Sequence, residues 1–243
     1  MENKISAGSY DLNKWLYGGY EKDIITTICG DAGTGKTNFC MCVAASQVKK
    51  GNKVIFIDTE GGFSAERLKQ LLPEDYEKSL ELILILKPTN FEEQWDAFGK
   101  LLKELKNEKE NRIGVIIVDG MTMLYRLLLA ESKEDKKKID EINSRLARQM
   151  RMLAEIARKR NIPVIATNQV YYGFLSEEEL KAGIKKEAHM VGGDIMAYWS
   201  KCIIELRNEK GRRKAVLRKH RSLKEGDFNF EIYNGGIRKK GWL

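Results

Sequence analysis

Cysteine and histidine are scarce in this 243-residue chain. The four cysteines include no Cys-x-x-Cys pair, and the only histidines are His189 and His220. A structural zinc site and a disulfide framework are therefore both disfavoured. Two of the cysteines, Cys40 and Cys42, fall in a predicted helix and Cys29 in a predicted strand, so we expect small buried thiols in a reducing compartment.

Long hydrophobic runs are also missing. The run Leu82–Leu86 is far too short to span a bilayer, and Met1–Lys4 lacks the apolar core of a secretory signal. We therefore expect a cytoplasmic protein with no membrane partner. Because 243 residues at 42% hydrophobic can bury one sizeable core, and no repeat or linker divides the chain, we expect a single domain.

The excess of positive charge is confined to one stretch. Residues 207–224 hold nine Lys or Arg and one acid, Glu209, and so account for the whole net charge of +8. Such a concentration suits a polyanion, because each neutralised phosphate releases counterions. A solvated hairpin whose basic edge resists aggregation explains the charge equally well. The candidate DNA contacts are Arg212, Arg213, Lys214, Arg218, Lys219 and Arg221.

The chain has a complete phosphate-binding loop. Residues 30–37 read Gly-Asp-Ala-Gly-Thr-Gly-Lys-Thr and follow the apolar run Ile24–Ile28. Glycines let backbone N–H groups converge on phosphate oxygens, Lys36 reaches the β- and γ-phosphates, and the Thr37 hydroxyl ligates Mg²⁺. The helix that follows adds its positive N-terminal end. The pattern predicts a nucleoside triphosphate site formed by Gly30, Asp31, Ala32, Gly33, Thr34, Gly35, Lys36, Thr37 and Asn38.

Strand and helix patterns alternate as far as Ile195, and strand patterns follow it. Apolar strands separated by helices specify a parallel sheet covered on both faces. The later strands, joined by glycine-bearing turns, indicate an antiparallel extension of that sheet. We therefore predict an α/β fold with a mostly parallel twisted sheet, helices on both faces and a C-terminal antiparallel extension. The expected strands are 53–58, 82–86, 113–119, 164–167, 201–207, 214–219 and 228–233, and the expected helices include 36–50, 64–72 and 90–110.

Polar side chains stand where three of the predicted strands end. Asp119 is placed to hold Mg²⁺ through water opposite Thr37, because ligands of open α/β sheets bind at the carboxyl ends of strands. Glu60 follows a neighbouring strand and could orient and deprotonate the water that attacks the γ-phosphate. Gln169 follows another strand, and its amide could sense the γ-phosphate.

Several segments together resemble the ATPase core of the RecA/RadA recombinase family. They are residues 5–9, 30–37, 56–63, 66–68, 118–119 and 167–170, and the match continues through Gly192-Gly193-Asp194 to Phe230. The resemblance implies a RecA-like P-loop core. It also implies that residues 1–243 form a single ATPase domain, without the N-terminal helical DNA-binding domain and docking linker of full recombinases, as in the short archaeal paralogues.

The resemblance also implies roles for individual residues. Lys36 would bind the phosphates, Thr37 and Asp119 would bind magnesium, and Glu60 would be the catalytic base. Gln169 would be the γ-phosphate sensor, and Arg67 would pack on adenine.

The family's two DNA-facing loops fall at about 127–138 and 170–191. The first loop has mixed charge, and a solvated lead-in to a helix is the better interpretation. The second begins Tyr171-Tyr172-Gly173-Phe174, whose aromatic rings could stack on bases or pack on the domain.

Some positions depart from the family pattern. Gly120 replaces the serine that usually follows the magnesium-binding aspartate, and Asp194 and Tyr198 replace an Asn and a nearby His. Strand exchange by this chain alone is therefore not expected. Arg221 and Lys224 stand where the segment that caps a neighbour's ATP normally has prolines. Lys219 and Arg221 could thus act in trans on a neighbour's phosphates, as an arginine finger does, or serve DNA.

In function, the resemblance implies an ATP- and DNA-binding protein of homologous recombination and repair with weak ATPase activity. Its expected partners are single-stranded or branched DNA, the main recombinase and a Holliday-junction resolvase, with at most weak or ATP-dependent self-association. One alternative is an ATP-gated mediator with essentially no turnover. Another is a circadian-clock-type RecA ATPase, which is disfavoured because that group pairs two acids where this chain has Glu60 followed by Gly61.

Overall fold

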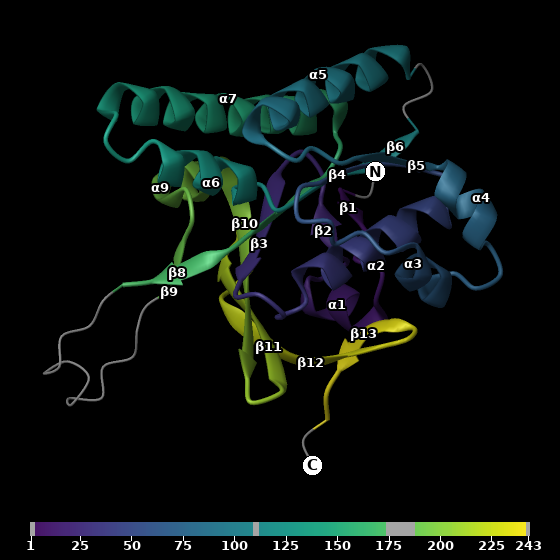
Figure 1. The fold of residues 1–243 in the computed structure, drawn as a ribbon. Coiled ribbons are helices and arrows are strands. Elements are labelled where there is room, and N and C mark those ends of the chain that lie inside the picture. Colours follow the sequence, from purple (N-terminus) through teal and green to yellow (C-terminus); the bar gives the residue numbers. More distant parts are fainter. Residues whose placement is uncertain (1–2, 109–111, 174–187, 242–243) are drawn as a thin grey trace, which may run out of the picture.

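The computed structural model describes residues 3–108, 112–173 and 188–241, and a nine-stranded twisted sheet runs through its centre (Figure 1). The strand order across this sheet is β13-β12-β11-β10-β3-β7-β6-β4-β5. Its strands are β3 (Ile25–Gly30), β4 (Lys53–Asp58), β5 (Ile83–Leu86), β6 (Ile113–Asp119), β7 (Val164–Asn168), β10 (Ser200–Glu209), β11 (Arg212–Lys219), β12 (Gly226–Tyr233) and β13 (Gly236–Lys239).

The sheet is parallel from β5 to β10 and antiparallel from β10 to β13. The strand β10 joins the two parts, since it pairs in parallel with β3 and antiparallel with β11. This arrangement confirms the predicted α/β fold and its C-terminal extension. Two small antiparallel pairs lie outside the main sheet: β1 (Lys4–Ile5) with β2 (Tyr20–Glu21), and β8 (Val170–Tyr172) with β9 (Ala188–Met190).

Helices cover both faces of the parallel part of the sheet (Figure 1). On one face lie α1 (Tyr10–Trp15), α2 (Lys36–Val48), α3 (Ala65–Leu71) and α4 (Tyr76–Glu81). On the other lie α5 (Phe91–Asn107), α6 (Met123–Glu131), α7 (Lys136–Arg160) and α9 (Gly193–Trp199). Among the described residues, no helix combines the length and apolar character needed to cross a bilayer.

Two hydrophobic cores result from the alternation of side chains along the strands. In β4, Val54 and Phe56 pack into the core beneath α2, whereas Ile55 and Ile57 pack into the core beneath α5 and α7. All four side chains are at most 2% exposed. A strand buried on both faces has no polar face to display, which explains the uninterrupted apolar runs in the sequence.

The helix starts follow local capping chemistry. The Asn90 side chain accepts the Glu93 N–H at 2.9 Å and the Ser64 hydroxyl accepts the Arg67 N–H at 3.1 Å, so α5 and α3 begin where the sequence predicts.

Register places the ends of the parallel strands along one edge of the sheet. Asp58 at the end of β4 lies opposite Asp119 at the end of β6, and Gly30 at the end of β3 lies opposite Leu206 in β10. This carboxyl edge is where a ligand site of such a sheet is formed.

Candidate nucleotide site and nucleic-acid interface

The phosphate-binding loop occupies the turn between β3 and α2. Gly30 closes the strand with φ +153°, and a Cβ there would lie 2.3 Å from the Leu206 carbonyl oxygen of β10. Gly35 precedes α2 with φ +110° and provides no side-chain cap. The first N–H groups of α2 therefore keep their capacity to bind an anion.

The Lys36 ammonium lies against the loop itself. Its Nζ donates to the carbonyl oxygens of Gly30 and Asp31, each at 2.9 Å, and the residue is 6% exposed. Burial lowers the pKa of Lys36, while the nearby carboxylates of Glu60, Asp119 and Asp31 act in the opposite direction. The ammonium thus sits among the loop carbonyls, at the position from which it can reach a phosphate.

Asp119 and Thr37 come together from opposite sides of the site. The Thr37 hydroxyl donates to Asp119 Oδ2 at 2.7 Å, and the Thr167 hydroxyl donates to Oδ1 at 2.6 Å. Burial raises the pKa of the Asp119 carboxyl, and these two hydroxyl donors partly offset that rise. The sequence reasoning missed Thr167, although its position near the end of β7 was a usable signal.

This donor set fits Mg²⁺, because a hydroxyl and a carboxylate are the hard oxygen ligands that the ion prefers. Among the described residues, no group of three or more His, Cys, Asp or Glu side chains could hold a metal. Thr37 and Asp119 would therefore share the ion with phosphate oxygens and water, as is usual for magnesium in phosphoryl-transfer sites.

Glu60 and Gln169 lie next to each other at the same carboxyl edge of the sheet. The Gln169 amide nitrogen donates to Glu60 Oε1 at 3.2 Å. The turn that carries Glu60 is fixed by Asp58, whose carboxylate accepts the N–H groups of Gly62 and Phe63, both at 3.0 Å. Sequence reasoning did not assign Asp58 this role, although an acid followed by Gly61-Gly62 was a signal for it.

Arg67 binds the hairpin formed by β12 and β13. Its Nε donates to Asn38 Oδ1 at 2.9 Å, and its NH2 group donates to the Tyr233 carbonyl at 2.9 Å and the Gly236 carbonyl at 3.4 Å. These bonds fix the plane of the guanidinium beside Asn38 in α2. They leave the adenine contact of Arg67 as a prediction.

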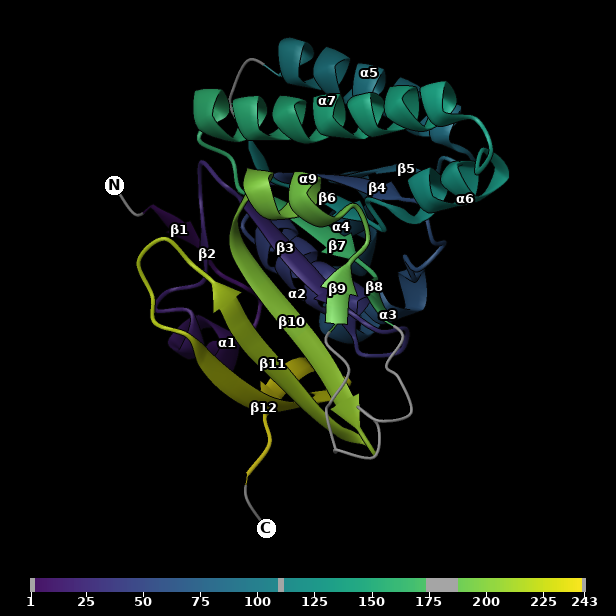
Figure 2. The ribbon, with the colours of Figure 1, turned by 90° about the vertical axis from the view of Figure 1, so that its left-hand side faces the viewer.

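The fold divides the basic stretch between two ends of the β10–β11 hairpin. At the tip of the hairpin, Arg212 pairs with Glu209. Glu209 follows Leu206 by three residues, and Leu206 lies opposite Gly30 of the phosphate-binding loop, so the tip is near that loop. Lys219 pairs with Ile203, toward the opposite end of β3. Figure 2 shows this long hairpin running the height of the sheet. The stretch is therefore two separate basic regions rather than one patch.

Acids from outside the stretch neutralise part of its charge. Glu205 accepts Arg218 Nε at 2.5 Å and Arg207 Nε at 2.6 Å, and Lys214 forms an ion pair with Asp227. Within the described part of the chain, Arg212 and Arg213 have no ion-pair partner. Arg212 is exposed at the hairpin tip, whereas Arg213 is half-buried and its Nε is shielded from solvent.

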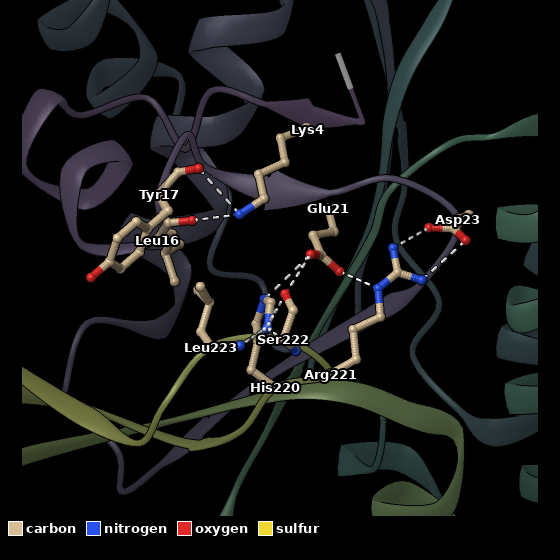
Figure 3. Close-up of polar contacts among 9 residues, drawn as sticks. All are labelled: Lys4, Leu16, Tyr17, Glu21, Asp23, His220, Arg221, Ser222 and Leu223. Carbon is tan, nitrogen blue, oxygen red and sulfur yellow. Dashed lines mark hydrogen bonds and ion pairs between the residues drawn. The ribbon is translucent and has the colours of Figure 1, made fainter. Parts of the chain in front are cut away.

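Arg221 lies in a separate cluster at the base of the hairpin (Figure 3). Its Nε donates to Glu21 Oε2 at 2.5 Å and its NH2 group donates to Asp23 Oδ1 at 2.8 Å. Asp23 precedes β3, whereas the phosphate-binding loop follows it, so about 20 Å of strand separates Arg221 from the chain's own nucleotide site. Lys219 Nζ donates to the Ala197 carbonyl at 2.8 Å.

Exposed aromatic rings lie near the second predicted DNA loop. Tyr171 and Tyr172 in β8 are 49% and 44% exposed. Tyr198 in α9 is 68% exposed but lies at the base of the β10–β11 hairpin, beside Ala197, whose carbonyl accepts Lys219. Lys201 Nζ lies 5.6 Å from the centre of the Tyr198 ring. Phe174 and most of that loop fall outside the described residues. Exposed aromatic rings such as those of Tyr171 and Tyr172 can stack on bases.

Comparison with known proteins gives a consistent assignment. A sequence profile of the Rad51 family matches residues 3–240. A protein of Methanococcus maripaludis called "DNA repair and recombination protein RadB" is 39% identical over 227 residues, covering 93% of this chain and 96% of that protein. A protein of the same name from Methanococcoides burtonii is 40% identical over 240 residues, covering 98% of this chain and 99% of that protein. A solved structure described as "Crystal structure of the RadB recombinase" superposes with a TM-score of 0.76 at 31% identity, covering 98% of this chain and all of that one.

Proposed function

The chain belongs to the Rad51 family and to its RadB group, whose named role is DNA repair and recombination, and on that premise we propose that it is an ATP- and DNA-binding accessory protein with weak ATPase activity. The full-length RadB relatives favour recombination over the circadian-clock alternative. The observation that carries the proposal is the convergence of Lys36, Thr37 and Asp119 at the end of β3.

In the proposed site, Lys36 exchanges the carbonyls of Gly30 and Asp31 for the β- and γ-phosphates. Thr37 and Asp119 would hold Mg²⁺, and the ion would neutralise charge on the phosphates. Glu60 orients the attacking water and accepts its proton, and Gln169, bonded to Glu60, responds to the γ-phosphate. The hydrogen bond between the Glu60 and Gln169 side chains supports these two roles, because it keeps the base and the sensor adjacent.

The second candidate function is an ATP-gated mediator, in which ATP binding controls recombinase loading and ATP hydrolysis is negligible. It is supported at Gly120, where a Cβ would lie 2.3 Å from Thr59 Oγ1 and 2.7 Å from Glu60 Cγ. The serine expected in the family cannot occupy this backbone without displacing Glu60. The catalytic edge therefore differs from that of a full recombinase.

The proposed DNA interface combines Arg212 and Arg213 at the hairpin tip with the exposed rings of Tyr171 and Tyr172. Lys214 and Arg218 are proposed contacts that would first have to exchange Asp227 and Glu205 for phosphate. The proposed protein partners are the main recombinase and a Holliday-junction resolvase, and proposed self-association is weak and ATP-dependent.

Two variants test the proposed function. Lys36→Ala should abolish tight ATP binding in titration calorimetry, since no other described cation replaces the β/γ contact. Glu60→Gln should keep ATP affinity and lower the steady-state ATPase rate by about 10²-fold or more, because the amide keeps the shape and loses the base. Measurements with and without single-stranded DNA distinguish a DNA-linked ATPase from a mediator.

An ATP affinity that Lys36→Ala leaves unchanged would overturn the site. Hydrolysis that Glu60→Gln leaves undiminished would remove Glu60 from the mechanism. A parent protein that binds ATP tightly but shows no turnover with any DNA would establish the gated mediator instead.

A further inference from the structure

A hydrogen bond joins the phosphate-binding loop to the β8–β9 hairpin. The Tyr172 hydroxyl donates to Asp31 Oδ2 at 2.6 Å, a length typical of an O–H donor on a carboxylate. Asp31 is the second residue of the loop, and Tyr172 is the last residue of β8.

The two ends of this bond are held by different parts of the site. The backbone carbonyl of Asp31 is one of the two acceptors of the Lys36 ammonium, and its side chain accepts Tyr172. On the other side, Val170 and Tyr172 pair with Met190 and Ala188 of β9. The Asn168 side chain donates to the Val191 carbonyl at 2.8 Å, and this bond holds together the two ends of the β8–β9 hairpin.

From this geometry we propose that Tyr172 is a positioning residue that couples occupancy of the nucleotide site to the β8–β9 hairpin through Asp31. The inference rests on the proposed function, because it assigns the route by which ATP and DNA influence each other. Arriving phosphates must displace Lys36 from the Asp31 carbonyl, and their charge repels the Asp31 carboxylate. A shift of that carboxylate is transmitted to the hairpin by the hydroxyl of Tyr172.

The chemistry of the pair supports a defined donor and acceptor. The hydrogen bond to Asp31, together with burial, raises the pKa of Tyr172 to about 12, so the hydroxyl stays protonated near neutral pH. Coupling is reciprocal by thermodynamic necessity: a nucleic acid that moves the hairpin must change nucleotide affinity by the same factor. Gln169 and Glu60 form a neighbouring link at the start of the same strand.

The chain supplies a matched control in Tyr171. Side chains alternate along a strand, so Tyr171 points away from Tyr172, and its ring contacts His189 with the ring centres 5.7 Å apart. Tyr171→Phe and Tyr172→Phe both remove one hydroxyl and keep the ring available for stacking. Only Tyr172→Phe removes the bond to Asp31.

The test measures affinity of the full chain for a fluorescent ADP analogue with Mg²⁺, with and without a saturating thymidine oligonucleotide. We expect the oligonucleotide to change the parent's nucleotide affinity by about five-fold or more. Tyr172→Phe should bring that ratio to within about two-fold of one, while Tyr171→Phe keeps the parent's ratio. Hydrogen exchange at 170–172 and 188–190 provides a readout without DNA: nucleotide should alter it in the parent and not in Tyr172→Phe.

Two results overturn the inference: a coupling ratio that Tyr172→Phe retains, or a parent that binds both ligands with a ratio of one. Failure of the proposed function is distinguishable from both, because it would appear as no binding of the nucleotide or of the oligonucleotide by the parent. If only the oligonucleotide fails to bind, the exchange measurement decides, and nucleotide-induced changes that persist in Tyr172→Phe reject the inference.

Discussion

Single residues of this site act in more than one role at once. Asp119 accepts two threonine hydroxyls through its carboxylate, and its backbone carbonyl accepts the Thr59 hydroxyl at 3.1 Å. The single Thr59 hydroxyl proton is shared with the Gly120 carbonyl oxygen, 2.7 Å from Oγ1, and this contact fastens the end of β4 to the end of β6. A buried carboxylate with its hydrogen bonds made keeps its orientation, and this is what a metal ligand needs before the metal arrives.

His220 is the residue whose titration should be visible in the stability of the fold (Figure 3). Its Nδ1 accepts the N–H groups of Ser222 and Leu223, both at 3.1 Å, so the ring must be neutral and carry its proton on Nε2. Burial lowers the pKa of His220, with Lys4 and Arg221 acting in the same direction and Glu21 in the opposite one.

The lowered pKa gives stability a defined pH dependence. Above pH 6.5 His220 is neutral in both the folded and the unfolded state, and its contribution to the free energy of unfolding is complete. As the pH falls below 6.5, His220 takes up its proton first in the unfolded chain, so the free energy of unfolding falls. We expect His220→Asn, whose amide oxygen can replace Nδ1 as acceptor, to lose less unfolding free energy between pH 7.5 and pH 5 than the parent. Urea denaturation at both pH values measures this, with His189→Asn as the control. Equal losses in His220→Asn and the parent would show that the pKa of His220 is the same in the folded and unfolded states.

At the scale of elements, the sequence predicts best where burial or capping decides the structure. The strands β4 and β6 match their predicted ranges, and α5 starts after its Asn90 cap. The helix α2 ends at Val48, two residues before the predicted end at residue 50.

Short elements whose stability comes from tertiary contacts were not predicted. The helix α1 has six residues, with only Leu12 buried among them, and the β8–β9 pair has three residues in each strand. Neither is long enough to produce a period in the sequence. The polar residues of the site were predictable from their place after strands, but the Tyr172–Asp31 bond was not, because it joins positions 141 residues apart.

The β10–β11 hairpin carries the prediction on DNA. If Arg212 and Arg213 contact phosphates, Arg212→Ala/Arg213→Ala should weaken binding similarly for all sequences. It should also reduce the magnitude of the salt slope by about 1.5 to 2. Lys214→Ala should change that slope less than the double variant does, because Lys214 must first give up its ion pair with Asp227. Fluorescence anisotropy of a labelled oligonucleotide over a series of salt concentrations measures both. If the double variant's line of log affinity against log salt overlies the parent's, the hairpin tip is only a solvated edge.

Across the whole molecule, charge is arranged by the sheet rather than by the sequence. One continuous basic stretch becomes a tip beside the phosphate-binding loop and a base beside β2, because β11 runs antiparallel to β10 for eight residues. The tip can reach DNA together with the β8–β9 rings. The base is about a strand's length from the chain's own phosphate-binding loop, so a nucleotide that contacted the base would have to belong to another subunit.

Self-association should therefore depend on ATP and remain weak. Arg221 must give up Glu21 and Asp23 before it can approach a neighbour's phosphates, and Lys219 must give up the Ala197 carbonyl. In sedimentation velocity we expect monomers or small oligomers without nucleotide, and at most weak association with a non-hydrolysable ATP analogue. Lys219→Ala is the cleaner variant, because replacing Arg221 would leave the buried Glu21 without its ion pair.

Loss of the ATP-dependent association in Lys219→Ala, with DNA affinity intact, would assign Lys219 to the subunit interface. The matched control is Lys201→Ala, which removes a neighbouring cation and keeps Lys219. Burial is the larger cause of the lowered pKa of Lys219, and the charge of Lys201 is the second cause. An association unchanged in Lys219→Ala but accompanied by weaker DNA binding would assign the base of the hairpin to DNA instead. Long filaments formed by the protein alone, without nucleotide or DNA, would contradict the prediction entirely, because such contacts could not depend on bridging a phosphate.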